Sequence, residues 1–126
     1  MIRFTKEQVL ELHRDLIESS GGIDGIRDEG LLDSALNMPF LMFANQELYP
    51  DIIAKGARLG YGLISNHPFL DGNKRIGVHT MLLFLEFNGF ELVYDDNDLI
   101  NLIMSIASGE KGNEELEDWI RKHVSD

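Results

Sequence analysis

The sequence predicts an all-α fold: one compact domain over residues 1–126, a bundle of about six helices. Apolar residues recur at the spacing of a helix face through most of the chain. Residues that cap helices stand before these apolar runs, and glycine or proline ends them. A length of 126 residues suits a single domain, and 44% hydrophobic residues are enough for a packed core.

Two helices separated by a glycine-rich turn are predicted near the N-terminus. The first begins at Thr5, because Thr5 and Gln8 form a capping-box pattern, and it ends at the run 19–22, Ser-Ser-Gly-Gly. A shorter helix fits Asp28 to Met38, and Pro39 ends it.

Residues 40–50 give no clear period. They are apolar and aromatic at first and then polar, so a turn, a flap and a short extended piece all remain open. The apolar side chains around this segment predict either a partner-binding flap or core filling. They are Met38, Phe40, Met42 and Phe43.

Two longer helices are predicted to form the centre of the bundle. The first opens at Pro50-Asp51 and ends at Asn66, because His67-Pro68 interrupts it. It contains three glycines at 56, 60 and 62, each of which costs about 1 kcal/mol relative to alanine in a helix. We therefore expect another helix to approach closely there. The second runs from residue 72 or 73 to 88, with Gly89 as its stop.

The C-terminal third predicts two more helices. Residues 92–94 form a short extended connector. A helix then runs to Ala107 with Asp95, Asp96 and Asp98 in its first turn, where negative charge complements the helix dipole. A final helix covers residues 113–123.

The chain is acidic, with 22 Asp and Glu against 11 Lys and Arg and a formal net charge of −11. A field of this sign repels phosphate backbones and anionic lipid, so we expect no direct nucleic-acid partner and no membrane partner. The N-terminus turns polar too early for a signal peptide, and no apolar stretch is long enough for a membrane span. The absence of cysteine excludes disulfides and suits a cytoplasmic location.

The polar loop between the two central helices, within residues 67–75, is where we expect the active site. Gly72 and Asn73 stand at a helix start, whose unpaired N–H groups and positive dipole favour an anion. Lys74 and Arg75 add cations at the end of a helix where anions are usually preferred, which indicates an anion from outside the chain.

Two further residues of this loop could supply catalysis. Asp71 is an oxygen ligand that could hold Mg²⁺ against phosphates, and His67 could take a proton from a hydroxyl. Each residue also has a simpler interpretation: Asp71 and Asn73 as helix caps, Lys74 and Arg75 as surface charges. Phe69 is expected to anchor the loop in the core. The remaining histidines lack companion ligands at zinc spacing, so we expect packing or surface roles for His13, His79 and His123.

The run His67-Pro68-Phe69-Leu70-Asp71-Gly72-Asn73-Lys74-Arg75 resembles the signature of the Fic/Doc family, in the Doc-branch form H-x-F-x-(D/N)-(G/A)-N-K-R. The segments 27–32, 47–50 and 84–89 also resemble that branch, so the likeness covers most of the chain. It implies a Fic/Doc-type helical bundle that uses ATP and Mg²⁺.

The resemblance also implies roles for the loop residues. The position of His67 is the base that activates a hydroxyl on a target protein, and that of Asp71 holds Mg²⁺. The implied catalytic residues are His67, Asp71, Asn73, Lys74 and Arg75. The implied nucleotide-binding residues are Phe69, Gly72, Asn73, Lys74 and Arg75.

As a Doc-branch member, the chain would be the toxin of a toxin–antitoxin pair, a kinase that transfers the γ-phosphate of ATP. The implied target is elongation factor Tu, whose modification blocks translation, and the implied inhibitor is a Phd-like antitoxin. The inhibitor would act in trans, because residues 20–25 match the letters of the family's inhibitory helix but contain paired glycines that favour a turn. AMP transfer, as in Fic enzymes, is the first alternative. A non-catalytic protein-binding module and a metal-dependent hydrolase using His67 and Asp71 are more distant ones.

Overall fold

The computed structural model describes residues 1–125 and confirms the all-α prediction. Within these residues the chain forms six α-helices, one 3₁₀ turn and one two-stranded hairpin. The helices are α1 (Lys6–Ser20), α2 (Glu29–Asn37), α3 (Ile52–Ser65), α4 (Asn73–Phe87), α5 (Asp96–Ala107) and α6 (Asn113–His123). The 3₁₀ turn η1 (Met38–Phe40) precedes β1 (Met42–Phe43) and β2 (Gln46–Glu47), which pair antiparallel.

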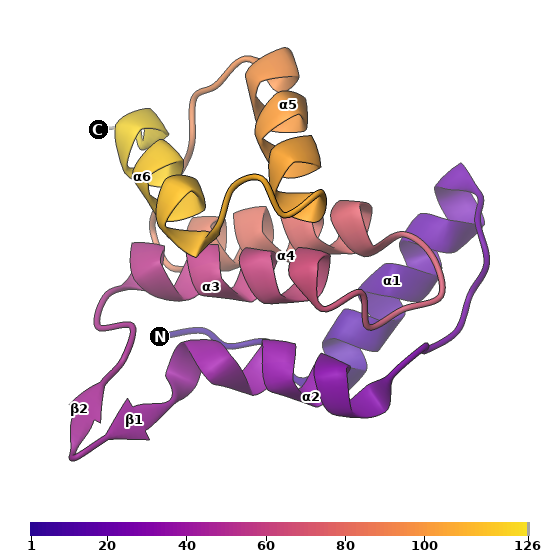
Figure 1. Ribbon diagram of the computed structural model, residues 1–126, viewed down its shortest axis with the longest axis horizontal. Coiled ribbons are helices and arrows are strands. Elements are labelled where there is room, and N and C mark those ends of the chain that lie inside the picture. The colour runs from indigo at the N-terminus through magenta and orange to yellow at the C-terminus, as the bar shows by residue number, and fades with distance from the viewer. Residues whose placement is uncertain (126) are drawn as a thin grey trace.

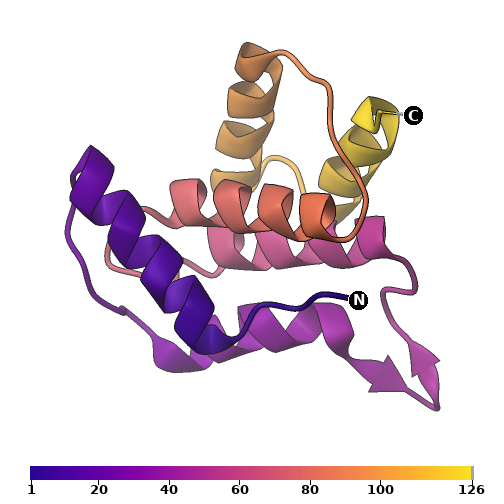
Figure 2. The same cartoon turned by 180° about the vertical axis from the view of Figure 1, so that it is seen from behind.

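Helices α3 and α4 lie side by side at the centre of the molecule (Figure 1). Helix α2 packs on α3 from one side, and α5 and α6 pack from the opposite side. Helix α1 crosses α4, as the view from behind shows (Figure 2). Every other helix therefore contacts α3 or α4, and the loop that joins these two helices emerges at one end of the central pair.

The glycines of α3 allow the close approach predicted from the sequence. A Cβ added at Gly60 would lie 2.8 Å from Sδ of Met81, and one added at Gly77 of α4 would lie 2.6 Å from Cγ1 of Ile64. Real Cβ atoms do not come this close to their neighbours, so only glycine permits this spacing of the two helix backbones.

Two apolar clusters form on either side of the central pair. One lies between α3, α4, α5 and α6 and includes Met81, Leu85 and Leu116. The other lies between α1, α2, α3 and α4 and includes Val9, Leu32 and also Phe69, the anchor of the site loop. The site loop is thus tied to the N-terminal cluster through a buried aromatic ring.

Local capping signals fix most helix starts. Thr5 accepts from the N–H of Gln8 while the Gln8 side chain accepts from the N–H of Thr5, so the predicted capping box is present. Asp28, Asp51 and Asp95 cap α2, α3 and α5 through their side-chain oxygens, which accept from N–H groups of the first turn. These bonds satisfy N–H groups that have no partner within a helix.

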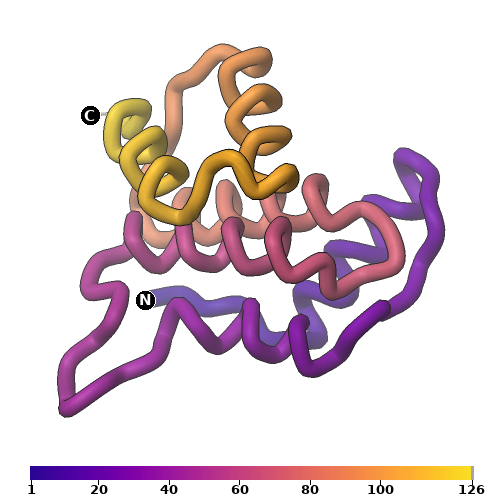
Figure 3. Tube along the Cα trace, viewed as in Figure 1, coloured from indigo at the N-terminus to yellow at the C-terminus, as the bar shows by residue number. Residues whose placement is uncertain are grey.

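The ambiguous segment 40–50 forms the hairpin, which extends away from the bundle in the tube view (Figure 3). Phe40 packs on Phe84 in the core, whereas Met42 and Phe43 are exposed. Core filling is therefore confirmed for Phe40, whereas partner binding by the exposed residues stays a prediction. In the part of the chain that the structure describes, no helix has the length and apolar character required to cross a membrane.

Candidate active site

The candidate site begins where α3 ends. Asn66 is the C-terminal cap of α3, and the next residue, His67, has a φ of +48°. A residue with a Cβ pays about 1–3 kcal/mol to occupy this left-handed region, and a following proline adds a further restriction. The His67 side chain is exposed, and none of the hydrogen bonds found in residues 1–125 engages its ring nitrogens. A free imidazole is therefore presented to solvent by a strained turn.

The segment between α1 and α2 holds the loop from outside. The carbonyl of Pro68 accepts from the N–H groups of Arg27 and Asp28 at 2.7 and 3.0 Å, and the N–H of Leu70 donates to the carbonyl of Gly25. The Arg27 side chain adds bonds to the carbonyls before Pro68. The loop is thus paired like a short strand, although it belongs to no sheet.

Asn73 closes the loop from within. Its side-chain oxygen accepts from the N–H of Phe69 at 2.9 Å, and its side-chain nitrogen donates to the carbonyl of Phe69 at 3.0 Å. The side chain therefore pairs with both backbone groups of one residue and does not cap α4. Phe69 itself is 1% exposed, as expected for an anchor.

His13 of α1 is part of the site, which the sequence did not indicate. It is 1% exposed, its ring stacks on that of Phe69 at 3.8 Å, and its Nε2 lies 2.7 Å from the carbonyl oxygen of Asp71. Its Nδ1 lies 3.5 Å from Asp24. The prediction of a packing role was correct, but the packing partner is the site loop. A signal existed: His13 occupies an apolar-face position between Val9 and Ile17.

The carboxylate of Asp71 stays ionised. The N–H groups of Ile23 and Gly72 donate to it at 3.1 and 2.8 Å, and these bonds, with the nearby Arg75 guanidinium, lower the pKa of Asp71 below its ordinary value. Each of its oxygens accepts one bond, so each retains a lone pair for a cation. Asp71 therefore fits the role of a Mg²⁺ ligand, with phosphate oxygens and water completing the shell as is usual for this ion. In residues 1–125 no three His, Cys, Asp or Glu side chains cluster as a metal site.

Helix α4 presents its N-terminus beside this carboxylate. Gly72 precedes it with a φ of +77°, and the first intrahelical bond is from the N–H of Ile76 to the carbonyl of Gly72. The three preceding N–H groups, of Asn73, Lys74 and Arg75, lie before that first bond and point out of the helix end. Together with the dipole, these N–H groups favour an anion at this helix end.

The two cations of the signature lie differently. Arg75 points toward the C-terminal end of α1, where its Nη1 donates to Oγ of Ser20 at 2.5 Å and to the carbonyl of Gly21 at 2.9 Å. Lys74 is exposed on the first turn of α4. Arg75 is thus held in place by α1, whereas Lys74 is free to follow a ligand.

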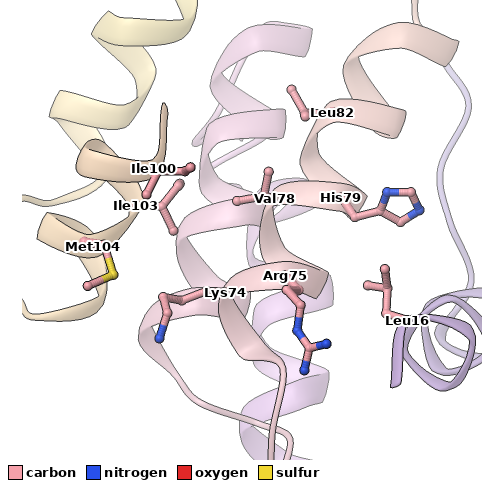
Figure 4. Close-up of a pocket in the computed structure, with 9 residues that line it drawn as sticks. All are labelled: Leu16, Lys74, Arg75, Val78, His79, Leu82, Ile100, Ile103 and Met104. Atoms are coloured by element: carbon pink, nitrogen blue, oxygen red, sulfur yellow. The ribbon is translucent and has the colours of Figure 1, made fainter. Parts of the chain in front are cut away.

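A cavity of about 420 Å³ adjoins these cations between α1, α4 and α5 (Figure 4). Its polar residues are Lys74, Arg75 and His79, all on α4. The rest of its lining is apolar: Leu16, Val78, Leu82, Ile100, Ile103 and Met104. His79 therefore lies at the edge of the site, although the sequence suggested only packing or a surface position for it.

A sequence model described as the Fic/DOC family matches residues 3–85, which include the whole loop, all of α3 and α4 as far as Leu85. The chain belongs to the Fic/DOC family. It is 29% identical over 122 residues to the protein named protein kinase doc of Escherichia phage P1, which covers 97% of this chain and 95% of that protein. It is 39% identical over 75 residues to toxin Doc of Mycolicibacterium smegmatis, which covers 60% of this chain and 58% of that protein.

These relatives place the Fic/DOC chain in the Doc branch, as its signature predicted. The structure brings the predicted residues together at one end of the central helix pair: His67 at the end of α3, Asp71 in the loop, and Asn73 to Arg75 on the first turn of α4. Arg27 and His13, which the signature does not contain, complete the support of that loop.

Proposed function

We propose that this Fic/DOC protein is a Doc-like toxin that transfers the γ-phosphate of ATP to a hydroxyl group of a target protein. The observation that carries the proposal is the arrangement of the loop. It presents a free imidazole at one end and the unpaired N–H groups of α4 at the other, with an ionised carboxylate between them in the chain. The whole-length likeness to a phage protein named as a kinase supports it.

In the proposed reaction, His67 takes the proton of the attacking hydroxyl. The hydroxyl oxygen forms a bond to the γ-phosphorus while the bond from that phosphorus to the bridging oxygen breaks, and ADP leaves. The exposed ring of His67 suits a large protein substrate, because a hydroxyl on a protein surface can reach it without entry into a deep pocket.

The phosphate side of the site is proposed to be held by α4. The N–H groups of Asn73, Lys74 and Arg75 can donate to phosphate oxygens, and Lys74 can move to the oxygens that gain charge during transfer. A bound Mg²⁺ would supply charge neutralisation there, with Asp71 as its protein ligand. Arg75 is pre-positioned by α1, so its guanidinium loses little freedom on binding phosphate.

The proposed biological role is that of a growth-arresting toxin whose target is elongation factor Tu. Residues 21–24, between α1 and Gly25, are not helical, so the segment 20–25 that matches the letters of the inhibitory helix does not form such a helix. Inhibition in trans by a Phd-like antitoxin is consistent with this. The cavity beside Lys74 and Arg75 is a suitable place for an antitoxin segment with apolar and acidic side chains.

The decisive experiment compares ATP labelled at the γ-phosphate with ATP labelled at the α-phosphate. The purified protein is incubated with Mg²⁺, each ATP in turn, and elongation factor Tu. Transfer of the γ-label alone is the expected result. Transfer of the α-label alone would establish AMP transfer and reject the kinase proposal.

Growth provides a readout that does not depend on the choice of target. Induction of the wild-type protein should arrest growth, and His67→Ala should relieve the arrest. His123→Ala is the matched control, because His123 is a half-buried histidine of α6 that bonds the Trp119 carbonyl far from the loop in sequence and fold. Equal growth arrest by wild type and His67→Ala would show that catalysis is not the cause and would favour a binding module.

A further inference from the structure

Arg27 holds three successive carbonyl groups of the site loop. Its Nε donates to the carbonyl of His67 at 2.6 Å, and its Nη2 donates to the carbonyl of Asn66 at 2.9 Å. Its own backbone N–H donates to the carbonyl of Pro68 at 2.7 Å. Arg27 lies outside the signature and just before α2, and it takes no direct part in the proposed chemistry.

These bonds act where the backbone is least able to hold its own shape. His67 has a φ of +48°, carries a Cβ and precedes a proline, so its conformation persists only if its surroundings impose it. The planar guanidinium is suited to bind two neighbouring carbonyl oxygens at once, since its N–H groups form a rigid fork. It also places a cation at the C-terminal end of α3, where the helix dipole is negative.

We propose that Arg27 is a positioning residue for the reaction: through this fork it fixes the peptide of His67 in its left-handed conformation and so aims the imidazole at the substrate hydroxyl. This inference rests on the proposed function, in which His67 is the base. It assigns Arg27 no contact with ATP or with the target. Its effect passes entirely through His67.

The structure separates this role from a general contribution to folding. Arg27 is exposed, so its side chain fills no part of the core. The docking of the segment before α2 on the loop, which can be followed in Figure 3, also rests on backbone bonds from Asp28 to Pro68 and from Leu70 to Gly25. Those bonds remain when the Arg27 side chain is removed, so the loop should stay in place while the turn at His67 loses its clamp.

The test uses the whole chain and the variants Arg27→Ala and Arg27→Lys. We expect Arg27→Ala to lower the rate of γ-label transfer at saturating ATP by roughly 10- to 100-fold, because small misplacements of a base have effects of this order. The dissociation constant for Mg-ATP, measured by calorimetry, should change less than about twofold. Lysine can satisfy one carbonyl but cannot form the fork, so Arg27→Lys should recover only part of the rate.

Arg3→Ala is the matched control, since Arg3 is another exposed arginine with comparable contacts. It donates to Asn37 at 2.9 Å and lies over the Phe40 ring at 3.9 Å, but it contacts nothing in the site loop. We expect Arg3→Ala to transfer label at the wild-type rate.

Combination with His67→Ala completes the test. If Arg27 acts through His67, adding Arg27→Ala to His67→Ala should lower the residual transfer by less than about twofold. The inference is overturned if the two losses multiply, if Arg27→Ala transfers label at the wild-type rate, or if Mg-ATP affinity falls in proportion to the rate. Should Arg27→Ala fail to fold, Arg27→Lys and Arg27→Gln are judged by the same criteria. If His67→Ala itself retains the wild-type rate, the proposed function fails. If His67→Ala is inactive but Arg27→Ala is fully active, only the inference about Arg27 fails.

Discussion

Two connections meet α3, and they are built in opposite ways. The loop that leaves α3, residues 66–72, has its aromatic side chain buried and is held by bonds from α1, from α4 and from the segment before α2. The hairpin that enters α3, residues 41–48, exposes four large apolar side chains. They are Leu41, Met42, Phe43 and Leu48.

Among the described residues 1–125, the side-chain bonds that anchor the hairpin lie near its base. Lys55 of α3 is buried, and its ammonium donates to the carbonyl of Tyr49 and lies 3.2 Å from Glu47. Beyond that point the hairpin consists of its two short strands and a turn with positive φ at Ala44 and Asn45. The comparison shows that tertiary contacts are concentrated on the site loop, which must keep one geometry. The hairpin has few such contacts and can change its conformation more easily.

The largest expected effect is a difference in unfolding free energy between a variant of the site loop and a variant of the hairpin. Phe69→Ala removes a ring that is 1% exposed and stacked on His13, so we expect a loss of about 3–5 kcal/mol of unfolding free energy. Phe43→Ala removes a ring that is 75% exposed and should change it by less than about 0.5 kcal/mol. Urea denaturation of both variants measures the difference, and equal losses would contradict the comparison.

A smaller effect is expected from the internal closure of the site loop. Asn73→Ala leaves the N–H and carbonyl of Phe69 without partners, which should cost about 1–3 kcal/mol. It should also slow label transfer. Asn101→Ala on the exposed face of α5 is the control, and it should leave both stability and transfer unchanged. A fully stable and active Asn73→Ala would show that the external bonds alone hold the loop.

A dependence of stability on pH should arise from the site loop. The pKa of Asp71 is lowered in the folded state by the N–H groups of Ile23 and Gly72. Its charged form therefore stabilises the fold at pH above the ordinary value of 3.8, and this contribution is lost as the pH falls through the lower folded-state pKa.

Melting temperatures of the wild type and Asp71→Asn from about pH 7 to about pH 3 measure this contribution. The gap between the two proteins should be constant at the upper end of the range and should shrink at the acid end. A gap that widens toward acid would contradict the sign of the shift. Asp118→Asn, at an exposed position on α6, serves as the control.

The smallest effect on stability is expected from Phe43→Ser in the hairpin, below about 0.5 kcal/mol. The partner-binding interpretation of this segment predicts a different consequence. The KM for the protein substrate should rise, while the dissociation constant for Mg-ATP should stay the same. An unchanged KM would contradict the partner-binding interpretation and would indicate that the hairpin only connects η1 to α3.

The helices could be predicted closely because their signals are local. Thr5, Asp28 and Asp95 cap the helices that follow them, and Gly89 and Pro39 stand near helix ends, as predicted. The three glycines of α3 correctly indicated a close neighbour, since a glycine in a helix is tolerated where a side chain would collide. The hairpin stayed ambiguous because its strands are only two residues long and show no period.

The sequence by itself determined the order of helices, the position of the polar loop and, through the nine residues from His67 to Arg75, the family. These features rest on neighbours within a few positions of each other. Only the tertiary structure decided that His13 supports Asp71, that Arg27 clamps the turn at His67 and that Arg75 turns toward α1. Those contacts join residues 40 or more positions apart, and they exist only because α1 and α2 pack against the central pair; no local pattern records which side chains such packing brings together.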